Sequence, residues 1–118
     1  MLSKGEVGSG GESLAAQWLA KQGFTILERN FRHLRYEVDI IAGRHAILHF
    51  IEVKCRRSAS FGHPEESVSR KKLEHILQGG AGWLAQWPGH HRVQYDVLAI
   101  TLQKQAPPEY VLFEDVYL

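Results

Sequence analysis

The stretch that decides the fold runs from residue 35 to residue 57 and reads RYEVDIIAGRHAILHFIEVKCRR. Side chains two apart on a strand point the same way. On that basis residues 35–41 divide into an apolar set and a set with two acids: Tyr36, Val38 and Ile40, and Glu37, Asp39 and Ile41. A turn centred on Gly43 leads to a longer strand over 46–55. The stretch therefore predicts an antiparallel hairpin.

The residues before the hairpin predict one helix and one more strand. Apolar residues at helical spacing indicate a helix over 11–22, and Gly23 followed by Phe24 is typical of its C-terminal stop. Residues 24–29 predict a short strand that ends in a polar turn at 30–33.

The residues after the hairpin predict a second helix and two strands. A loop over 58–64 precedes an apolar stripe of period near 3.6 within 73–87. Residues 92–101 and 110–117 predict the strands. With no internal repeat or linker, this order predicts a single α/β domain over 1–118, a sandwich with a mixed central sheet flanked by helices.

Composition narrows the class of protein. The chain has 118 residues, of which 44% are hydrophobic and 23% charged, as in an ordinary globular domain. No apolar run approaches the ~20 residues of a membrane helix, so no membrane contact is expected. The glycine-rich segment 1–10 is expected to be flexible and lacks the apolar stretch of a signal peptide, and Cys55 is the single cysteine. These features indicate a cytoplasmic protein.

The chemical signal is Asp39, followed 13 residues later by Glu52-Val53-Lys54. Glu52 and Lys54 share one strand face, and an antiparallel neighbour can place Asp39 beside them. Carboxylate oxygens suit Mg²⁺ or Mn²⁺. Lys54 can orient or deprotonate the attacking water, or counter charge in the transition state. The set outlines a site for phosphodiester hydrolysis.

A solvated cross-strand pair would show the same spacing of Glu52 and Lys54. Against that alternative, Leu48 and Phe50 share their face, so the charges continue an apolar row. The opposite face would carry Cys55, which is expected to be a buried side chain.

Two further acids are candidates. Glu12 lies three and seven residues before Ala15 and Leu19, on or beside the buried face of the first helix, where its carboxylate needs a partner. The alternative is an exposed glutamate in the first helical turn. Glu37, on the face of Asp39, is either a supporting acid behind the metal ligands or an exposed strand residue.

Net charge is only +1, so nucleic-acid binding must come from local clusters. Three basic clusters surround the acids: Arg29, Arg32 and Arg35; Arg56 and Arg57; and Arg70, Lys71 and Lys72. Such clusters neutralise phosphates. The alternative is a solvated run of charge.

Several ordered motifs resemble the bacterial YraN-type family of endonuclease-like proteins. They are Gly8-x-x-Gly11-Glu12-x-x-Ala15-Ala16, Arg29-Asn30-Phe31-Arg32, Glu37-Val38-Asp39-Ile40-Ile41, Phe50-Ile51-Glu52-Val53-Lys54-Cys55-Arg56-Arg57, Ser67-Val68-Ser69-Arg70-Lys71-Lys72 and Tyr95-Asp96-Val97. The resemblance extends to the PD-(D/E)xK nuclease superfamily, which includes archaeal Holliday junction resolvases. It implies a restriction-endonuclease-like core.

The resemblance also implies site roles. Its active-site positions fall on Glu12, Asp39, Glu52 and Lys54, with Asp39 and Glu52 as the metal ligands. Lys72 falls on another motif position, where it can meet a phosphate. One departure is Tyr36, which stands where the family pattern has glycine and fills space at the strand edge.

The expected function is hydrolysis of DNA by a Mg²⁺- or Mn²⁺-dependent nuclease, at branched or damaged structures. Arg56, Arg57 and Lys72 are expected to hold the strand, and a homodimer would supply two cuts. The alternatives are a non-catalytic nucleic-acid-binding or adaptor module that keeps the nuclease fold, and a small-molecule phosphatase that needs no basic rim.

Overall fold

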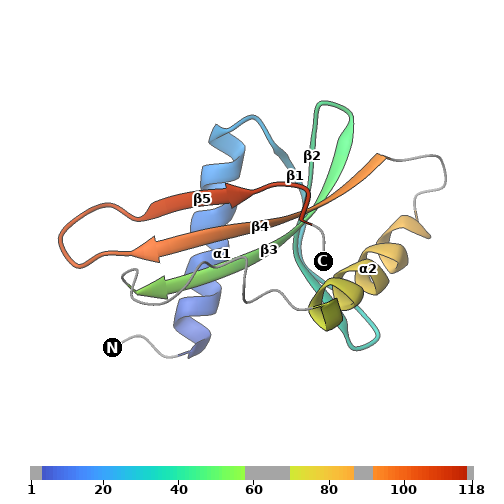
Figure 1. Cartoon of the computed structure of the whole chain (residues 1–118), viewed down its shortest axis with the longest axis horizontal. Helices are drawn as coiled ribbons and strands as arrows, with labels where there is room; N and C mark the ends of the chain where they lie inside the picture. The colour runs from blue at the N-terminus through green and yellow to red at the C-terminus, as the bar shows by residue number, and fades with distance from the viewer. Residues whose placement is uncertain (1–3, 58–69, 87–91, 117–118) are drawn as a thin grey trace.

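The computed structural model describes residues 4–57, 70–86 and 92–116, except for the side chains of residues 4–10. Five strands form one sheet in the order β1-β2-β3-β4-β5. The elements are α1 (Lys4–Lys21), β1 (Thr25–His33), β2 (Tyr36–Arg44), β3 (Ile47–Arg57), α2 (Arg70–Leu84), β4 (Arg92–Leu102) and β5 (Glu109–Phe113). Only β3 and β4 pair in parallel, across the connection that contains α2, so the sheet is mixed, as predicted (Figure 1).

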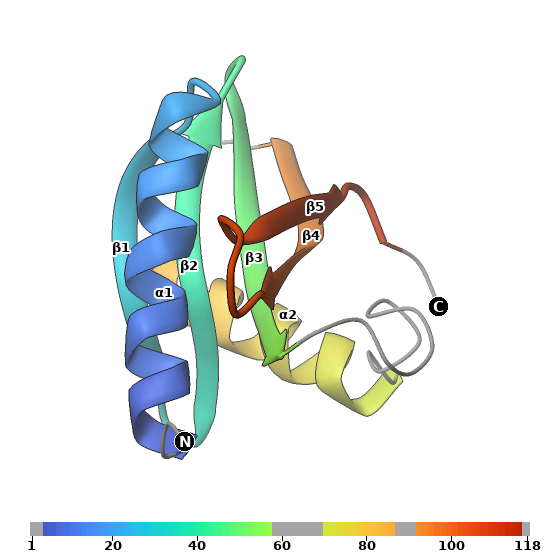
Figure 2. The same ribbon diagram turned by 90° about the vertical axis from the view of Figure 1, so that its left-hand side faces the viewer.

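The two helices cover opposite faces of the sheet (Figure 2). Ala15 and Leu19 of α1 pack on one core, with five buried residues from the sheet: Ile40, Ala42, Ile51, Leu98 and Ile100. Ile76 and Trp83 of α2 pack on the other core, with Val38, Ile41 and Phe50. At Gly80 the backbone of α2 comes so close to the sheet that a Cβ atom would overlap the ring of Phe50.

Strand β1 corrects the predicted turn at 30–33. It continues to His33, which pairs with Tyr36, so the connection to β2 is the two-residue turn Leu34–Arg35. The register shifts between Ile26 and Glu28, and β1 is paired with β2 on both sides of that point. Pairing with β2 outweighs the polar composition of the segment.

The second hairpin turn was also predicted in the wrong place. Gly43 lies within β2, between Thr25 and Leu48, and the turn is His45–Ala46. Both turn residues have positive φ, at 53° and 62°. That geometry favours Asn-Gly sequences, so a His-Ala pair carries no turn signal.

Other boundaries differ by less. Helix α1 begins at Lys4, so part of the segment 1–10 that was expected to be flexible is helical. Helix α2 ends at Leu84, and Trp87, like the predicted loop 58–64, lies outside the described residues. The prediction for β4 is confirmed, whereas β5 ends at Phe113 rather than at residue 117. None of the described helices is long and apolar enough to cross a membrane.

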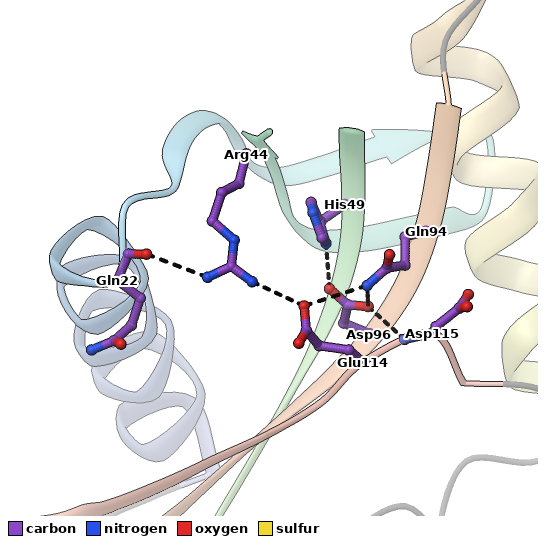
Figure 3. A network of polar contacts seen from close by, with 7 residues as sticks. All are labelled: Gln22, Arg44, His49, Gln94, Asp96, Glu114 and Asp115. Carbon is purple, nitrogen blue, oxygen red and sulfur yellow. Dashed lines mark hydrogen bonds and ion pairs between the residues drawn. The ribbon is translucent and has the colours of Figure 1, made fainter. Parts of the chain in front are cut away.

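A buried polar pair ties β3 to β4. His49 and Asp96 are 2% and 1% exposed, and His49 Nδ1 lies 2.6 Å from Asp96 Oδ2. Asp96 Oδ1 accepts hydrogen bonds from Gln94 Nε2 at 3.1 Å and from the backbone N–H of Asp115 at 2.9 Å (Figure 3). Asp96 therefore holds the segment after β5 against the sheet.

The same region reaches α1 through Arg44. Its guanidinium lies 2.9 Å from Glu114 Oε1 and donates to the Gln22 carbonyl at 3.3 Å (Figure 3). The guanidinium carbon also lies 3.9 Å from the centroid of the Phe24 ring. Sequence reasoning assigned no role to His49 or Arg44, because their partners are distant along the chain.

Candidate active site

The candidate site opens where β2 leaves β3. Pairing between these strands ends at Ile40 and Ile51, although β2 stays paired with β1 to Tyr36 and β3 stays paired with β4 to Arg57. Asp39 is the first residue of β2 beyond the pairing, and its Oδ2 accepts a hydrogen bond from the backbone N–H of Val53 at 2.8 Å. The divergence therefore places the Asp39 carboxylate between two strands.

The divergence also breaks the predicted alternation of β2. Val38 packs on the α2 side, whereas Ile40 packs on the α1 side, so the prediction that they share a face is wrong. In β3 the alternation holds. Phe50 lies on the α2 side, and Cys55 on the α1 side is half-buried, where burial raises the pKa of its thiol.

Two lysine ammonium groups contact the same carboxylate oxygen of Glu52. Its Oε1 lies 3.1 Å from Lys54 Nζ and accepts a hydrogen bond from Lys72 Nζ of α2 at 2.7 Å. Its Oε2 is buried and has no hydrogen-bond partner among the described residues. A buried carboxylate oxygen without a partner is costly unless a cation or donor satisfies it. The donor set therefore fits a hard divalent cation.

Two further carboxylates, those of Glu12 and Glu37, lie close to Asp39. Oxygens of Glu12, Glu37 and Asp39 all lie within 4.8 Å of one another. The pKa of Asp39 is raised from 3.8 to about 6. Burial is the main cause, the hydrogen bond from Val53 acts against it, and the nearby charges of Glu52, Glu12 and Glu37 add to it. Glu12 is half-buried beside Asp39, which excludes the alternative of a glutamate exposed in the first turn of the helix.

The two lysines differ in proton affinity. The pKa of Lys54 is lowered, mainly by burial and secondly by contact with Lys72. For Lys72, burial acts in the same direction, but hydrogen bonds to Glu52 and Lys54 outweigh it and raise its pKa. Lys54 is therefore the better placed of the two to exchange a proton with water.

Except for Glu12, these groups line one open pocket of about 410 Å³. Its lining consists of Arg35, Glu37, Asp39, Glu52, Val53, Lys54, Lys72, His75 and Ile76. Sequence reasoning missed His75, which is three residues beyond Lys72 and so shares its helix face. Tyr36 is not among the lining residues, and its ring packs edge-on against His75 at 5.2 Å.

The predicted basic residues are not all together. Lys72 and Arg35 line the pocket, whereas Arg56 and Arg57 follow Lys54 at the end of β3 and do not. Arg32 is paired with Glu37 at 3.3 Å on the exposed surface. Only part of the predicted basic rim therefore lies at the pocket.

Comparison with known proteins places these residues in a family. Residues 11–100 match the uncharacterised protein family UPF0102. The chain belongs to the UPF0102 family. This confirms the resemblance to the YraN-type family. The mixed five-stranded sheet with its two helices is consistent with the restriction-endonuclease-like fold of the superfamily to which that family belongs.

Individual UPF0102 proteins are similar along most of their length. The relative from Trichlorobacter lovleyi is 41% identical over 112 residues, covering 92% of this chain and 88% of the relative. One from Chlorobium phaeobacteroides is 39% identical over 110 residues, covering 92% and 86%. One from Chlorobaculum parvum is 49% identical over 79 residues, covering 67% and 61%. The UPF0102 match includes every candidate site residue named above.

The raised pKa of Asp39 predicts how stability depends on pH. The folded protein holds the Asp39 proton more tightly than the unfolded chain does. The protonated carboxyl therefore contributes its full share to the free energy of unfolding below about pH 4, and this share is lost as pH rises through about 6. The free energy of unfolding should fall by an amount on the order of 2 kcal/mol across that window. Urea unfolding in EDTA should show this fall for wild type but not for Asp39→Asn. Equal pH profiles would contradict the prediction.

Proposed function

We propose that this protein is a metal-dependent nuclease that hydrolyses phosphodiester bonds of DNA, at branched or damaged structures. The observation that carries the proposal is the convergence of Asp39, Glu52 and Lys54 in one open pocket, where Glu52 Oε2 is buried and no described residue hydrogen-bonds to it. Such a pocket admits a backbone phosphate and offers it both acids and a cationic donor.

In this proposal Asp39 and Glu52 hold Mg²⁺ or Mn²⁺. The bound ion would supply Lewis acidity and lower the pKa of coordinated water. Lys54, with its lowered pKa, positions the attacking water and takes up its proton. Glu12 accepts a hydrogen bond from water on the Asp39 side, and Glu37 supports Asp39 from the rim.

Lys72 changes its partner when DNA binds in this proposal. In the absence of substrate its ammonium group neutralises Glu52. When DNA binds, the same ammonium group contacts the incoming phosphate at the pocket mouth. Arg56 and Arg57 hold the strand beyond Lys54. These contacts supply the sequence-independent part of DNA binding.

A non-catalytic adaptor is the second candidate, and one observation favours it. Lys54 and Lys72 already neutralise Glu52, as two ammonium groups would in a protein that holds no metal. An adaptor would depend for DNA affinity on Arg56, Arg57 and Lys72, and their neutralisation would make its salt dependence shallower.

The test is cleavage of duplex, flapped, single-stranded and four-way DNA in Mg²⁺, Mn²⁺ or EDTA. Wild type is compared with Asp39→Asn and Lys54→Ala, each shown to be folded by circular dichroism. Metal-dependent cleavage that both substitutions abolish supports the nuclease. Cleavage that survives them indicates a contaminating enzyme and contradicts the site assignment. DNA binding without cleavage favours the adaptor.

The cellular location and the oligomeric state that the sequence led us to expect are part of the same proposal. We place the protein in the cytoplasm with its DNA, and as a homodimer on substrates that need two cuts. Light scattering with and without four-way DNA measures the second of these.

A further inference from the structure

The two-residue turn between β1 and β2 presents a leucine to solvent. Leu34 is 78% exposed, more than any other large hydrophobic residue that the structure describes: Leu27 is 43%, Leu77 37% and Val111 50% exposed. Its φ is +56°, in the left-handed region that disfavours residues with a Cβ. The position combines exposed apolar surface with an unfavourable backbone conformation.

The hairpin turn itself requires the positive φ, but leucine is an unusual residue to adopt it. A two-residue hairpin turn is ordinarily built from glycine, asparagine or aspartate, which accept positive φ. A leucine at such a position contributes almost no burial. Residues that violate local preference in this way are concentrated at functional sites.

The turn adjoins the candidate active site. Arg35, its second residue, lines the pocket and has its guanidinium carbon 5.3 Å from the centroid of the Tyr36 ring. Tyr36 in turn contacts His75, another residue that lines the pocket. The turn lies beside α2, in line with these contacts (Figure 1). Leu34 is thus next in sequence to a pocket residue, on a surface that carries arginines.

We infer that Leu34 is a wedge that enters an opened base step of DNA whose backbone phosphate lies in the pocket. Apolar side chains inserted between base pairs act in this way, and neighbouring arginines hold the flanking phosphates. The cost of opening a step is lowest where stacking is already interrupted. The wedge therefore selects duplex DNA with a gap, flap or junction. This inference rests on the proposed function and names its substrate class.

The experiment measures binding separately from cleavage. Fluorescence anisotropy in EDTA compares a gapped duplex and a four-way junction with a continuous duplex of the same sequence. Wild type is expected to prefer the discontinuous DNA. Leu34→Asn, which suits positive φ, is expected to weaken that binding about tenfold, as the loss of one buried leucine implies, and to change binding to continuous duplex less than twofold.

Matched variants separate the wedge from general effects. Leu34→Met keeps an apolar side chain and should retain the preference. Val111→Asn changes a half-exposed apolar residue on the opposite edge of the sheet, and Ala46→Gly relieves positive φ in the other hairpin turn. Both should retain the preference. Leu34→Asn should unfold at or above the wild-type temperature, because it removes strain and no core contact.

Three results would overturn the inference. If Leu34→Asn leaves the preference unchanged while Asp39→Asn still abolishes cleavage, the wedge is wrong and the nuclease stands. If Leu34→Asn converts a dimer into a monomer with the same preference, the leucine packs against a second copy instead. If wild type binds and cuts none of these DNAs, the proposed function fails and the wedge fails with it.

Discussion

Substitution of Glu52 by glutamine is expected to reduce metal-dependent DNA cleavage about 10³-fold, as removal of a preorganised charge from a site typically does. The amide keeps the size of the side chain but loses the charge that Oε1 presents to Lys54 and Lys72. It also replaces an acceptor-only carboxylate by a group with one acceptor oxygen, so the fit to a hard cation is lost.

Glu37→Gln is the matched control for this prediction. Glu37 lines the same pocket and lies near Asp39, but it is exposed and paired with Arg32. Its loss should change cleavage less than about tenfold, the scale of an indirect contact. Single-turnover cleavage and calorimetric Mg²⁺ titration measure the two effects. Similar losses for Glu52→Gln and Glu37→Gln would contradict the assignment of Glu52 as the metal ligand.

Substitution of Asp96 by alanine is expected to lower the free energy of unfolding by about 4 kcal/mol. The variant loses the acceptors for His49 Nδ1, Gln94 Nε2 and the N–H of Asp115, and leaves a buried imidazole without its carboxylate.

Glu114→Ala tests whether burial is the reason that loss of Asp96 destabilises the fold so strongly. Glu114 belongs to the same group of polar side chains, but its partner Arg44 lies near the surface and the pair is partly solvated. Its loss should cost about 1 kcal/mol or less. Urea unfolding at pH 7.5 measures both variants. If Asp96→Ala costs no more than Glu114→Ala, the buried pair does not hold the segment after β5 in place.

Local periodicity predicted the faces of β3 and the buried side of α1 correctly. In β3, Glu52 and Lys54 share a face and Cys55 lies on the other, because alternation is a property of one extended strand. Helical spacing in α1 likewise brings Glu12 to the side of Asp39. The element order and the mixed sheet follow from the same patterns.

The predictions that failed depended on how strands pair. Val38 and Ile40 alternate in sequence but pack on opposite faces, because β2 leaves β3 at Asp39 and no signal within β2 marks that point. The turns at Leu34–Arg35 and His45–Ala46 carry none of the usual turn residues, so their positions follow from the register of the strands.

The sequence by itself determined the order of the helices and strands, the faces of β3 and the family resemblance. Only the tertiary structure decided that Lys72 of α2 meets Glu52, that His75 lines the pocket and that His49 pairs with Asp96. The physical reason is that periodicity is set by bonds between neighbouring residues, whereas these contacts join groups 20 or more residues apart and form only when the sheet and its two helices pack together.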